Sequence, residues 1–438
     1  MSGLACALNR RRFLAGCTAL AALPQPVLSA PLVIRAAPLT AQILPEGDGT
    51  TELWGYNGTS PGPELRVHQG DGLDVTFENG IEQGSAIHWH GIRIDNKMDG
   101  VPYLTQTMVA PGQSFDYSFR LPDAGTYWYH AHNRSWEQVA RGLYGPLIVE
   151  ERQPPAVDHD ITVILDDWRI ERTGEIVENF GNRHDFAHAG RLGTYARAFP
   201  SVQSVRRGDR VRLRFINAAT ARVFPLEVSG ITGKVVALDG MPLASPTDVR
   251  RSFLTPAQRM DIIADVQDDI TFAIPTGDAP YELGTVSVKG NNPTPITAPI
   301  AALPPADVPR PAAKPDSSIE LVMQGGAMGG PHGGDDIWGF NGVSGMTDTP
   351  WQQIPRGQTV RITLVNDTGF PHGIHLHGHH FYEVDADGTI GALRDTTLLR
   401  RQERRDILCV FDNPGKWLLH CHMLDHAASG MNTWVEVV

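Results

Sequence analysis

A chain of 438 residues, 41% of them hydrophobic, is too long for one hydrophobic core and is expected to form two or three domains. Its 45 glycines and 33 prolines separate short runs of Val, Thr, Ile and Phe, a pattern that favours strands and turns over helices. The formal net charge of -12 argues against binding to nucleic acid or to an anionic membrane surface, and it attracts cations.

The first 37 residues have the composition of an export leader. Arg10–Arg12 precede the apolar, small-residue run Ala15–Leu28, which resembles a twin-arginine signal with cleavage between Ala30 and Ala37. The run is short for a transmembrane span, so a periplasmic protein without stable membrane association after export is predicted. Because these three arginines are the only charged residues before residue 31, removing them changes the formal charge from -12 to -15.

Three segments of the chain share one pattern, a Gly turn followed by a strand of alternating apolar and polar residues that ends at Asn. They are residues 67–79, 205–217 and 354–366, and in each of them the Gly stands nine residues before the Asn. The segments start 138 and 149 residues apart, which is the length of a β-sandwich domain and far exceeds a solenoid repeat. The repeat therefore predicts an all-β chain made of three β-sandwich domains.

The predicted domain boundaries follow from the repeats and from composition. Domain 1 is expected at 38–150, domain 2 at 151–290 and domain 3 at 317–438. Residues 291–316 hold eight prolines and are predicted to be a stiff, extended linker. A short helix is expected at Ser135–Gly142.

Paired histidines follow the repeat in the outer domains only. Nine residues after the Asn of the first and third repeats stand His88-Trp89-His90 and His375-Leu376-His377. Asp116, Asp261 and Asp406 are each predicted to close a loop of similar shape, and fourteen residues after the first and last of them stand His130-Ala131-His132 and His420-Cys421-His422. The corresponding positions of the middle domain are Leu226 and Pro275. Metal binding is therefore predicted for domains 1 and 3.

The last of these pairs organises the site. On an extended strand His420 and His422 point to one face, about 6.6 Å apart, while Cys421 points to the other. One strand can thus serve two metal sites. Together with His426 and Met431, Cys421 supplies a thiolate, an imidazole and a thioether, which lack only one more imidazole for a blue-copper centre. A zinc site would leave the single Cys and the Met unexplained.

The two cysteines outside the leader are predicted to have separate roles without a disulfide between them. Cys409 alternates with Ile407 and Phe411 along a strand and is expected to pack as a small buried hydrophobe. Cys421 is expected to be a metal ligand.

The motifs His88-Trp-His-Gly, Tyr129-His-Ala-His, His372-Gly-Ile-His-Leu-His-Gly and His420-Cys-His-x3-His-x4-Met, in this order, resemble those of three-domain multicopper oxidases of the bacterial laccase or cuprous oxidase type. The resemblance covers the whole chain after the leader. It implies three cupredoxin-like Greek-key β-sandwiches, a type 1 copper in domain 3 and a trinuclear copper cluster between domains 1 and 3.

The resemblance also implies which residues bind each of four copper ions. Type 1 copper is assigned to His372, Cys421, His426 and Met431, type 2 copper to His88 and His375, one type 3 copper to His90, His130 and His422, and the other to His132, His377 and His420. These assignments use ten of the 17 histidines, and His379 and His380 are expected to support the ligands or to pack in the core.

The implied activity couples four one-electron oxidations of a reductant to the reduction of O2 to water. Electrons would pass from Cys421 through the backbone to His420 or His422. Asp99, nine residues after His90, matches a carboxylate that assists proton supply in such oxidases, although an Asp before Gly is also a common turn residue. A second acid that some members carry is replaced here by Ala427.

The reductant is left open by the sequence. Phenols, Cu(I) and Mn(II) are all candidates, and a periplasmic copper-tolerance cuprous oxidase is the main alternative to a laccase. Met323, Met328 and Met346 lie around the loop Gly325–Gly334, and this loop with His332, Asp335 and Asp336 is either a metal-binding feature or a surface turn. A copper-free division or envelope scaffold protein would require missing ligands, and none is missing. The sequence does not define the oligomeric state.

Overall fold

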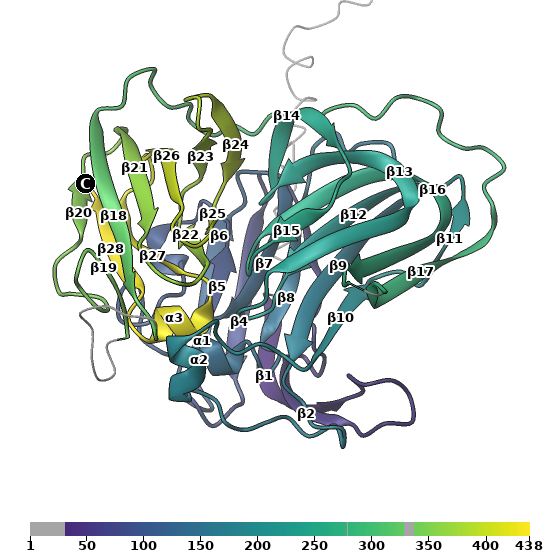
Figure 1. Ribbon diagram of the computed structural model, residues 1–438, viewed down its shortest axis with the longest axis horizontal. Helices are drawn as coiled ribbons and strands as arrows, with labels where there is room; N and C mark the ends of the chain where they lie inside the picture. The colour runs from purple at the N-terminus through teal and green to yellow at the C-terminus, as the bar shows by residue number, and fades with distance from the viewer. Residues whose placement is uncertain (1–30, 278, 328–336) are drawn as a thin grey trace, which may run out of the picture.

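The computed structural model describes residues 31–277, 279–327 and 337–438, and almost all of its regular structure is β-strand (Figure 1). This confirms the predicted all-β class. The predicted twin-arginine segment and most of the loop Gly325–Gly334, including Met328 and His332, lie outside the described residues, as do Asp335 and Asp336 directly after the loop. Within the described ranges, no helix has the length and apolar character needed to cross a bilayer.

The N-terminal sandwich consists of two four-stranded sheets. The first has the order β2-β1-β4-β6 and is built from β1 (Leu32–Ala41), β2 (Thr51–Tyr56), β4 (Gly72–Asn79) and β6 (Ser114–Arg120). The second has the order β3-β8-β7-β5 and is built from β3 (Leu65–His68), β5 (Ile87–His90), β7 (Gly125–Ala131) and β8 (Tyr144–Glu150). Along β4, Leu73, Val75 and Phe77 are buried while Asp74 is exposed, which is the alternation that a sheet with one buried face requires.

The middle domain is one continuous nine-stranded sheet and differs in this respect from its neighbours. Its strands are β9 (His159–Trp168), β10 (Tyr195–Pro200), β11 (Ser204–Arg207), β12 (Arg210–Asn217), β13 (Phe224–Leu238), β14 (Met241–Asp248), β15 (Ser252–Leu254), β16 (Arg259–Ile274) and β17 (Tyr281–Asn291). The register of β13 against β16 shifts near Gly230 and again near Val236. Such irregularities bend long strands, so the same two strands can serve both halves of a sandwich.

The C-terminal sandwich holds a six-stranded and a five-stranded sheet. The six-stranded sheet has the order β19-β18-β21-β26-β23-β24, with β18 (Ser317–Gly325), β19 (Trp338–Phe340), β21 (Thr359–Asn366), β23 (Phe381–Val384), β24 (Ile390–Arg394) and β26 (Arg404–Val410). The five-stranded sheet has the order β20-β28-β27-β22-β25, with β20 (Gln352–Ile354), β22 (His372–Leu376), β25 (Thr396–Leu399), β27 (Gly415–Cys421) and β28 (Asn432–Val437). Among the described residues there are three short α-helices, α1 (Ser135–Gln138), α2 (Arg183–Ala187) and α3 (Leu424–Ala428).

The three sequence repeats occupy equivalent positions, because β4, β12 and β21 are the repeat strands. The terminal Asn79, Asn217 and Asn366 are buried, and each side-chain amide donates hydrogen bonds to two carbonyl groups, one in the loop directly after its strand and one 30 to 37 residues further along the chain. Each Asn therefore fixes the loop that leads away from its strand, and in domains 1 and 3 that loop leads to the paired histidines.

The predicted loop positions of Asp116, Asp261 and Asp406 are wrong. These residues lie inside β6, β16 and β26, directly across from the repeat strands. Thr76 and Thr363 donate hydrogen bonds to the first and last of them, and Arg214 pairs with Asp261. An Asp can occupy a strand where a cross-strand partner satisfies its carboxylate.

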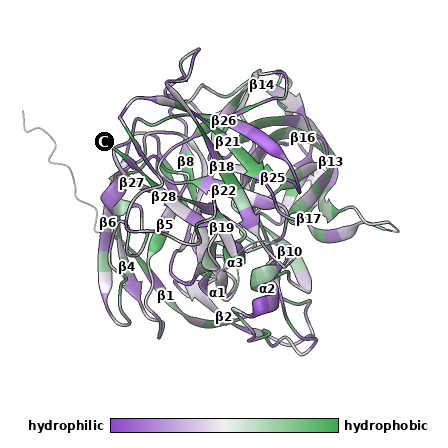
Figure 2. Cartoon of the chain, turned by 60° about the vertical axis from the view of Figure 1, so that its left-hand side comes forward, coloured by the Kyte–Doolittle hydropathy of each residue, from purple (hydrophilic) through white to green (hydrophobic). Residues whose placement is uncertain are grey.

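The two outer sandwiches share one hydrophobic cluster that extends from Ile34 to Val437, whereas the middle domain has its own core. Figure 1 shows the N-terminal sandwich between the other two, and Figure 2 shows apolar and polar residues interleaved along the strands. The proline-rich residues 292–316 contain no helix or strand. Hydrogen bonds hold this segment to the middle domain, where Arg210 donates to the Ala298 carbonyl, and to the N-terminal sandwich, where Arg93 donates to the Asp307 carbonyl.

Candidate metal centre

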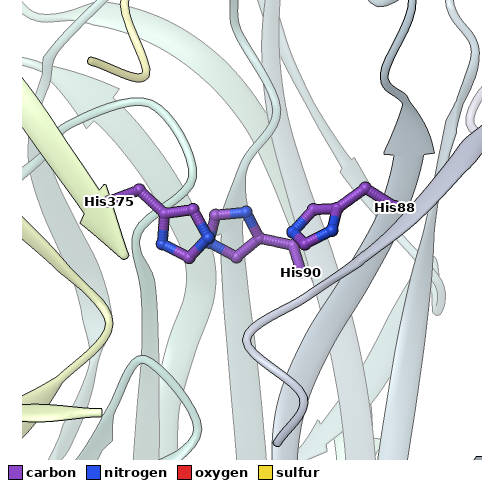
Figure 3. A group of neighbouring side chains, drawn as sticks. All are labelled: His88, His90 and His375. Atoms are coloured by element: carbon purple, nitrogen blue, oxygen red, sulfur yellow. The ribbon is translucent and has the colours of Figure 1, made fainter. Parts of the chain in front are cut away.

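The four His-x-His pairs lie at the ends of four strands, two in each outer sandwich. In the N-terminal sandwich β5 pairs with β7 and places His88 opposite His130, and in the C-terminal sandwich β22 pairs with β27 and places His375 opposite His420. Figure 3 shows His88 and His90 from β5 facing His375 from β22. The sandwich edges therefore bring eight imidazoles together between the domains, which we call the interface cluster; its members are His88, His90, His130, His132, His375, His377, His420 and His422.

The nitrogens of the interface cluster converge in three groups whose atoms lie within 4.8 Å of one another. The groups are His88, His90 and His375; His90, His130 and His422; and His132, His377 and His420. All eight side chains are buried except that of His132, which is partly exposed.

Hydrogen bonds from one ring nitrogen fix the orientation of several of these imidazoles. The Nδ1 atoms of His88, His130, His375 and His420 lie 2.7 to 3.0 Å from the backbone carbonyls of Asp99, Ala131, Asp395 and Cys421 respectively. Because a carbonyl only accepts hydrogen bonds, each Nδ1 carries the proton and each Nε2 keeps its lone pair. Histidine ligands of metals are commonly held in this way.

The chemistry of these rings fits a metal. In the part of the chain that the structure describes, the buried Nε2 atoms of His88, His130, His375 and His422 have no hydrogen-bond partner. Each buried nitrogen without a partner costs about 1–3 kcal/mol, a cost that metal coordination removes. Burial and the neighbouring imidazoles lower the pKa of His130 and His375 well below the ordinary value, and burial lowers that of His420 to about 4. The rings are thus neutral, as metal ligands must be.

A second cluster lies on the opposite face of β27. The Sγ atom of Cys421 is 3.6 Å from Nδ1 of His372 and 3.8 Å from Nδ1 of His426, and the two Nδ1 atoms are 3.0 Å apart. Both imidazoles are anchored through Nε2, His372 to the Thr368 hydroxyl at 2.8 Å and His426 to the His188 carbonyl at 2.6 Å. We call His372, Cys421, His426 and Met431 the thiolate cluster.

The thiolate cluster is fully buried, and this also favours a bound cation. Burial raises the pKa of Cys421 to about 12, so the thiolate requires a positive ion beside it. Met431 is buried too, its amide donates to the His426 carbonyl at 2.9 Å, and its carbonyl accepts from the Cys421 amide at 3.0 Å. One thiolate and two imidazoles suit copper, and a thioether such as that of Met431 is the usual further ligand of such a set.

Asp99 lies between two members of the interface cluster. Its carboxylate is 3.0 Å from Nδ1 of His377 and 3.3 Å from Nδ1 of His88, and it is completely buried. It directly follows the short 3₁₀ turn Asn96–Met98. Asp99 is therefore a turn residue, and its carboxylate also lies beside the histidines; the sequence had suggested each of these two features.

Sequence reasoning missed Asp395, a second buried carboxylate at the interface cluster. Its Oδ1 is 3.2 Å from Nε2 of His90, and both of its oxygens pair with the guanidinium of Arg259 from the middle domain. Burial raises the pKa of Asp395, but the Arg259 charge and hydrogen bonds lower it below its ordinary value overall. No local sequence motif predicts the ion pair between Arg259 and Asp395, because the two residues are 136 positions apart.

The remaining predicted positions are peripheral. His379 packs near Phe411 and Trp417, and its Nδ1 lies 3.2 Å from the His377 carbonyl, while His380 is buried near Asp395. The helix expected at Ser135–Gly142 is shorter than predicted, since α1 ends at Gln138. Cys409 is buried, as expected, and neither it nor Cys421 is in a disulfide within the described residues.

A surface pocket of about 260 Å³ reaches the interface cluster at His132 and His420. Tyr103, Trp136 and Met346 are among the residues that line it. The pocket gives small molecules a route from solvent to these two imidazoles.

Comparisons with known proteins agree with this geometry. Three family models described as multicopper oxidase match residues 39–154, 160–296 and 313–438. The solved structure of Lac15 from a marine microbial metagenome is similar with a TM-score of 0.82 and 55% identity, covering 93% of this chain and 100% of that chain. This similarity confirms the predicted cupredoxin-like fold.

Two curated relatives have different names. Laccase-1 of Botryotinia fuckeliana is 28% identical over 452 residues, covering 86% of this chain and 77% of the relative. Copper resistance protein A of Escherichia coli is 23% identical over 539 residues, covering 87% of this chain and 88% of the relative. The family models, the Lac15 similarity and the two buried clusters agree, and the chain therefore belongs to the multicopper oxidases, copper-dependent oxidoreductases that transfer electrons from a reducing substrate to O2.

Proposed function

We propose that the protein holds four copper ions, one in the thiolate cluster and three in the interface cluster. The type 1 ligands are His372, Cys421, His426 and Met431; the type 2 ligands are His88 and His375; the type 3 ligands are His90, His130 and His422 for one ion and His132, His377 and His420 for the other. The observation that carries this proposal is the group of four buried Nε2 atoms in the interface cluster that have no hydrogen-bond partner within the described residues, those of His88, His130, His375 and His422.

Copper at these sites supplies one-electron redox chemistry and the four-electron reduction of O2 to water. The chain provides the connection between the two clusters through Cys421, whose backbone neighbours His420 and His422 both belong to the interface cluster. A hydrogen bond of 2.9 Å from His420 Nδ1 to the Cys421 carbonyl shortens one of these two routes. The strand β27 thus links electron entry to the place of O2 reduction.

Asp99 and Asp395 have different roles in this proposal. The Asp99 carboxylate lies beside two imidazoles of the interface cluster, His377 and His88, and we assign it the supply of protons for the reduction of O2. The Asp395 carboxylate forms an ion pair with Arg259. Asp395 orients His90 through this side chain and His375 through its backbone carbonyl. Asp395 is therefore a positioning residue.

The proposal includes export and a three-domain organisation. Residues 1–37 act as a twin-arginine leader that delivers the protein to the periplasm, without stable membrane association afterwards, and the boundaries near residues 150, 290 and 316 divide the mature chain. The arginine-rich start of the sequence and the proline-rich linker support these two statements.

The reductant is an easily oxidised phenol or a metal ion. The Met-containing type 1 ligand set favours Cu(II) and hence a low potential, and the net negative charge attracts cations. Among the relatives, one is named a laccase and another a copper resistance protein, which supports both classes of donor.

Steady-state kinetics on Cu(I), Mn(II), dimethoxyphenol and unsubstituted phenol, with O2 uptake as the common readout, test this proposal. We expect O2 uptake with dimethoxyphenol and with Cu(I), and weak uptake with unsubstituted phenol. A fully copper-loaded protein that consumes no O2 with any of these donors would contradict the proposed function.

A further inference from the structure

A segment of the middle domain covers the thiolate cluster. Three successive backbone carbonyls, at the end of α2 and just beyond it, accept hydrogen bonds from the C-terminal sandwich: that of Phe186 from the Trp338 indole, that of Ala187 from the Ala327 amide, and that of His188 from Nε2 of His426. His426 is completely buried as a result. A donor molecule in solvent therefore meets α2 and not the type 1 ligand itself.

The outer side of the same segment carries two imidazoles. His184 and His188 are four residues apart, so they lie on one face of the helical turn, and their rings stack at a centroid distance of 4.3 Å with an interplanar angle of 14°. The side chain of His184 is 78% exposed, whereas that of His188 is partly buried.

The hydrogen bonds of the pair leave a lone pair free for a ligand. Nδ1 of His188 lies 2.9 Å from the His184 carbonyl and donates a hydrogen bond to it, so Nε2 is the ring nitrogen that is left for a ligand. The exposed ring of His184 can rotate about its side-chain bonds on a fast timescale, so it can leave the stack and turn a nitrogen toward an ion bound at His188 Nε2. Two histidines spaced i, i+4 on a helix are a recurrent metal-binding arrangement.

We propose that His184 and His188 bind Cu(I) as a substrate ion and form the entry point for its electron. This inference rests on the proposed function and names one of its donors. Imidazole nitrogens suit copper, whereas Mn(II) prefers carboxylates. The neighbouring carboxylate of Asp185 is not available for Mn(II), because both of its oxygens are bound by Arg169 at 2.7 and 2.9 Å.

The connection between the pair and the thiolate cluster is short. An electron released at the His188 ring crosses the Cα and carbonyl of that residue and the 2.6 Å hydrogen bond to His426. In this step bound Cu(I) loses one electron and leaves as Cu(II). Four such ions supply the four electrons that, with four protons, reduce one O2 to two waters in the oxidase reaction.

The test uses the full-length, copper-loaded protein and Ag(I), a redox-inert ion with the charge and ligand preference of Cu(I). Wild-type protein is compared with the double variant His184→Ala/His188→Ala in equilibrium dialysis against Ag(I). We expect the double variant to bind one Ag(I) fewer. We expect its ratio of kcat/KM for Cu(I) to kcat/KM for dimethoxyphenol to fall by about tenfold or more, as for the loss of groups that hold a metal.

Two further variants sharpen the result. His68→Ala removes another exposed imidazole, on β3 and 70% exposed, and is expected to change neither Ag(I) binding nor the kinetic ratio. His184→Met/His188→Met supplies thioethers, which also bind Cu(I), and is expected to restore Ag(I) binding. Retained blue absorption in all variants shows that the thiolate cluster is intact.

Equal Ag(I) binding by wild-type protein and the double alanine variant, or an unchanged kinetic ratio, would overturn the inference. Failure of the proposed function looks different, because then even the wild-type protein would consume no O2 with dimethoxyphenol. If wild-type O2 uptake with dimethoxyphenol is normal and the double alanine variant binds as much Ag(I) as wild type, the proposed function stands and only the proposed entry site at α2 is refuted.

Discussion

Cys421 has two kinds of neighbour, and the alternation of side chains along β27 separates them. Its thiol faces His372 and His426, while His420 and His422 point to the interface cluster on the opposite side. Replacing the sulfur should therefore affect one cluster and spare the other, because the backbone of the strand stays in place.

For Cys421→Ser we expect loss of the blue colour and of oxidase activity, with copper retained in the interface cluster. Electron paramagnetic resonance of the type 2 copper and metal analysis check the second half of this expectation. Loss of the folded structure in this variant would mean that Cys421 is needed mainly for packing.

Met431 is the residue through which the potential of the type 1 copper can be adjusted with least disturbance. A thioether donates electron density and favours Cu(II), so Met431→Leu should raise the potential, on the order of the 59 mV that corresponds to a tenfold change in the one-electron equilibrium. Redox titration of the blue absorption measures this shift. An unchanged or lowered potential would show that Met431 is not a ligand.

At the scale of strands, the domains are joined by buried polar side chains. Asp166 on β9 of the middle domain accepts a hydrogen bond from the hydroxyl of Tyr144 on β8 of the N-terminal sandwich. Burial, together with the neighbouring Asp167, raises the pKa of Asp166 well above its ordinary value. The folded protein therefore binds a proton here that the unfolded chain releases near pH 4.

The sign of the resulting pH dependence is fixed. Because the pKa is higher in the folded state, the contribution of Asp166 to stability is fully present below about pH 4 and is lost as the pH rises toward the folded-state pKa. Asp166→Asn removes this titration, so its thermal midpoint should fall less than that of wild type between pH 4 and the folded-state pKa. Exposed Asp74→Asn serves as the control and should follow wild type.

The salt bridge between Arg259 on β16 and Asp395 before β25 connects the middle domain to the interface cluster. Both side chains are 0% exposed, so Arg259→Gln leaves a buried, unpaired carboxylate at a cost of about 3–5 kcal/mol in unfolding free energy. Thermal unfolding measures this loss, and Arg259→Gln/Asp395→Asn should recover part of it. The half-exposed pair Arg251 and Glu227 provides a control, because Arg251→Gln should cost at most about 1 kcal/mol.

The sequence was informative where strands are regular. The period of two along β5, β7, β22 and β27 predicts which histidines share a face, and the repeated Asn places these strands equivalently in both outer domains. The contacts of Arg259 with Asp395 and of His188 with His426 were not predictable, because each joins residues more than 100 positions apart through a side chain or a single carbonyl. The continuous sheet of the middle domain depends on register shifts in β13 that have no sequence motif.

At the scale of the whole molecule, the outer sandwiches supply the side chains of both clusters, and the middle domain contacts each of the two clusters. Its Arg259 fixes Asp395 beside one cluster, and its α2 segment covers the other. The shared hydrophobic cluster of the outer domains keeps the two halves of the interface cluster in register. The middle domain thus contributes to the surroundings of both clusters.

The copper content decides whether both clusters are metal sites, and it is measured by metal analysis of the fully loaded, purified protein together with its visible spectrum. We expect four copper ions per chain and an intense blue colour from the Cys421 thiolate. Bound zinc, or fewer than three copper ions per chain after full loading, would contradict this expectation.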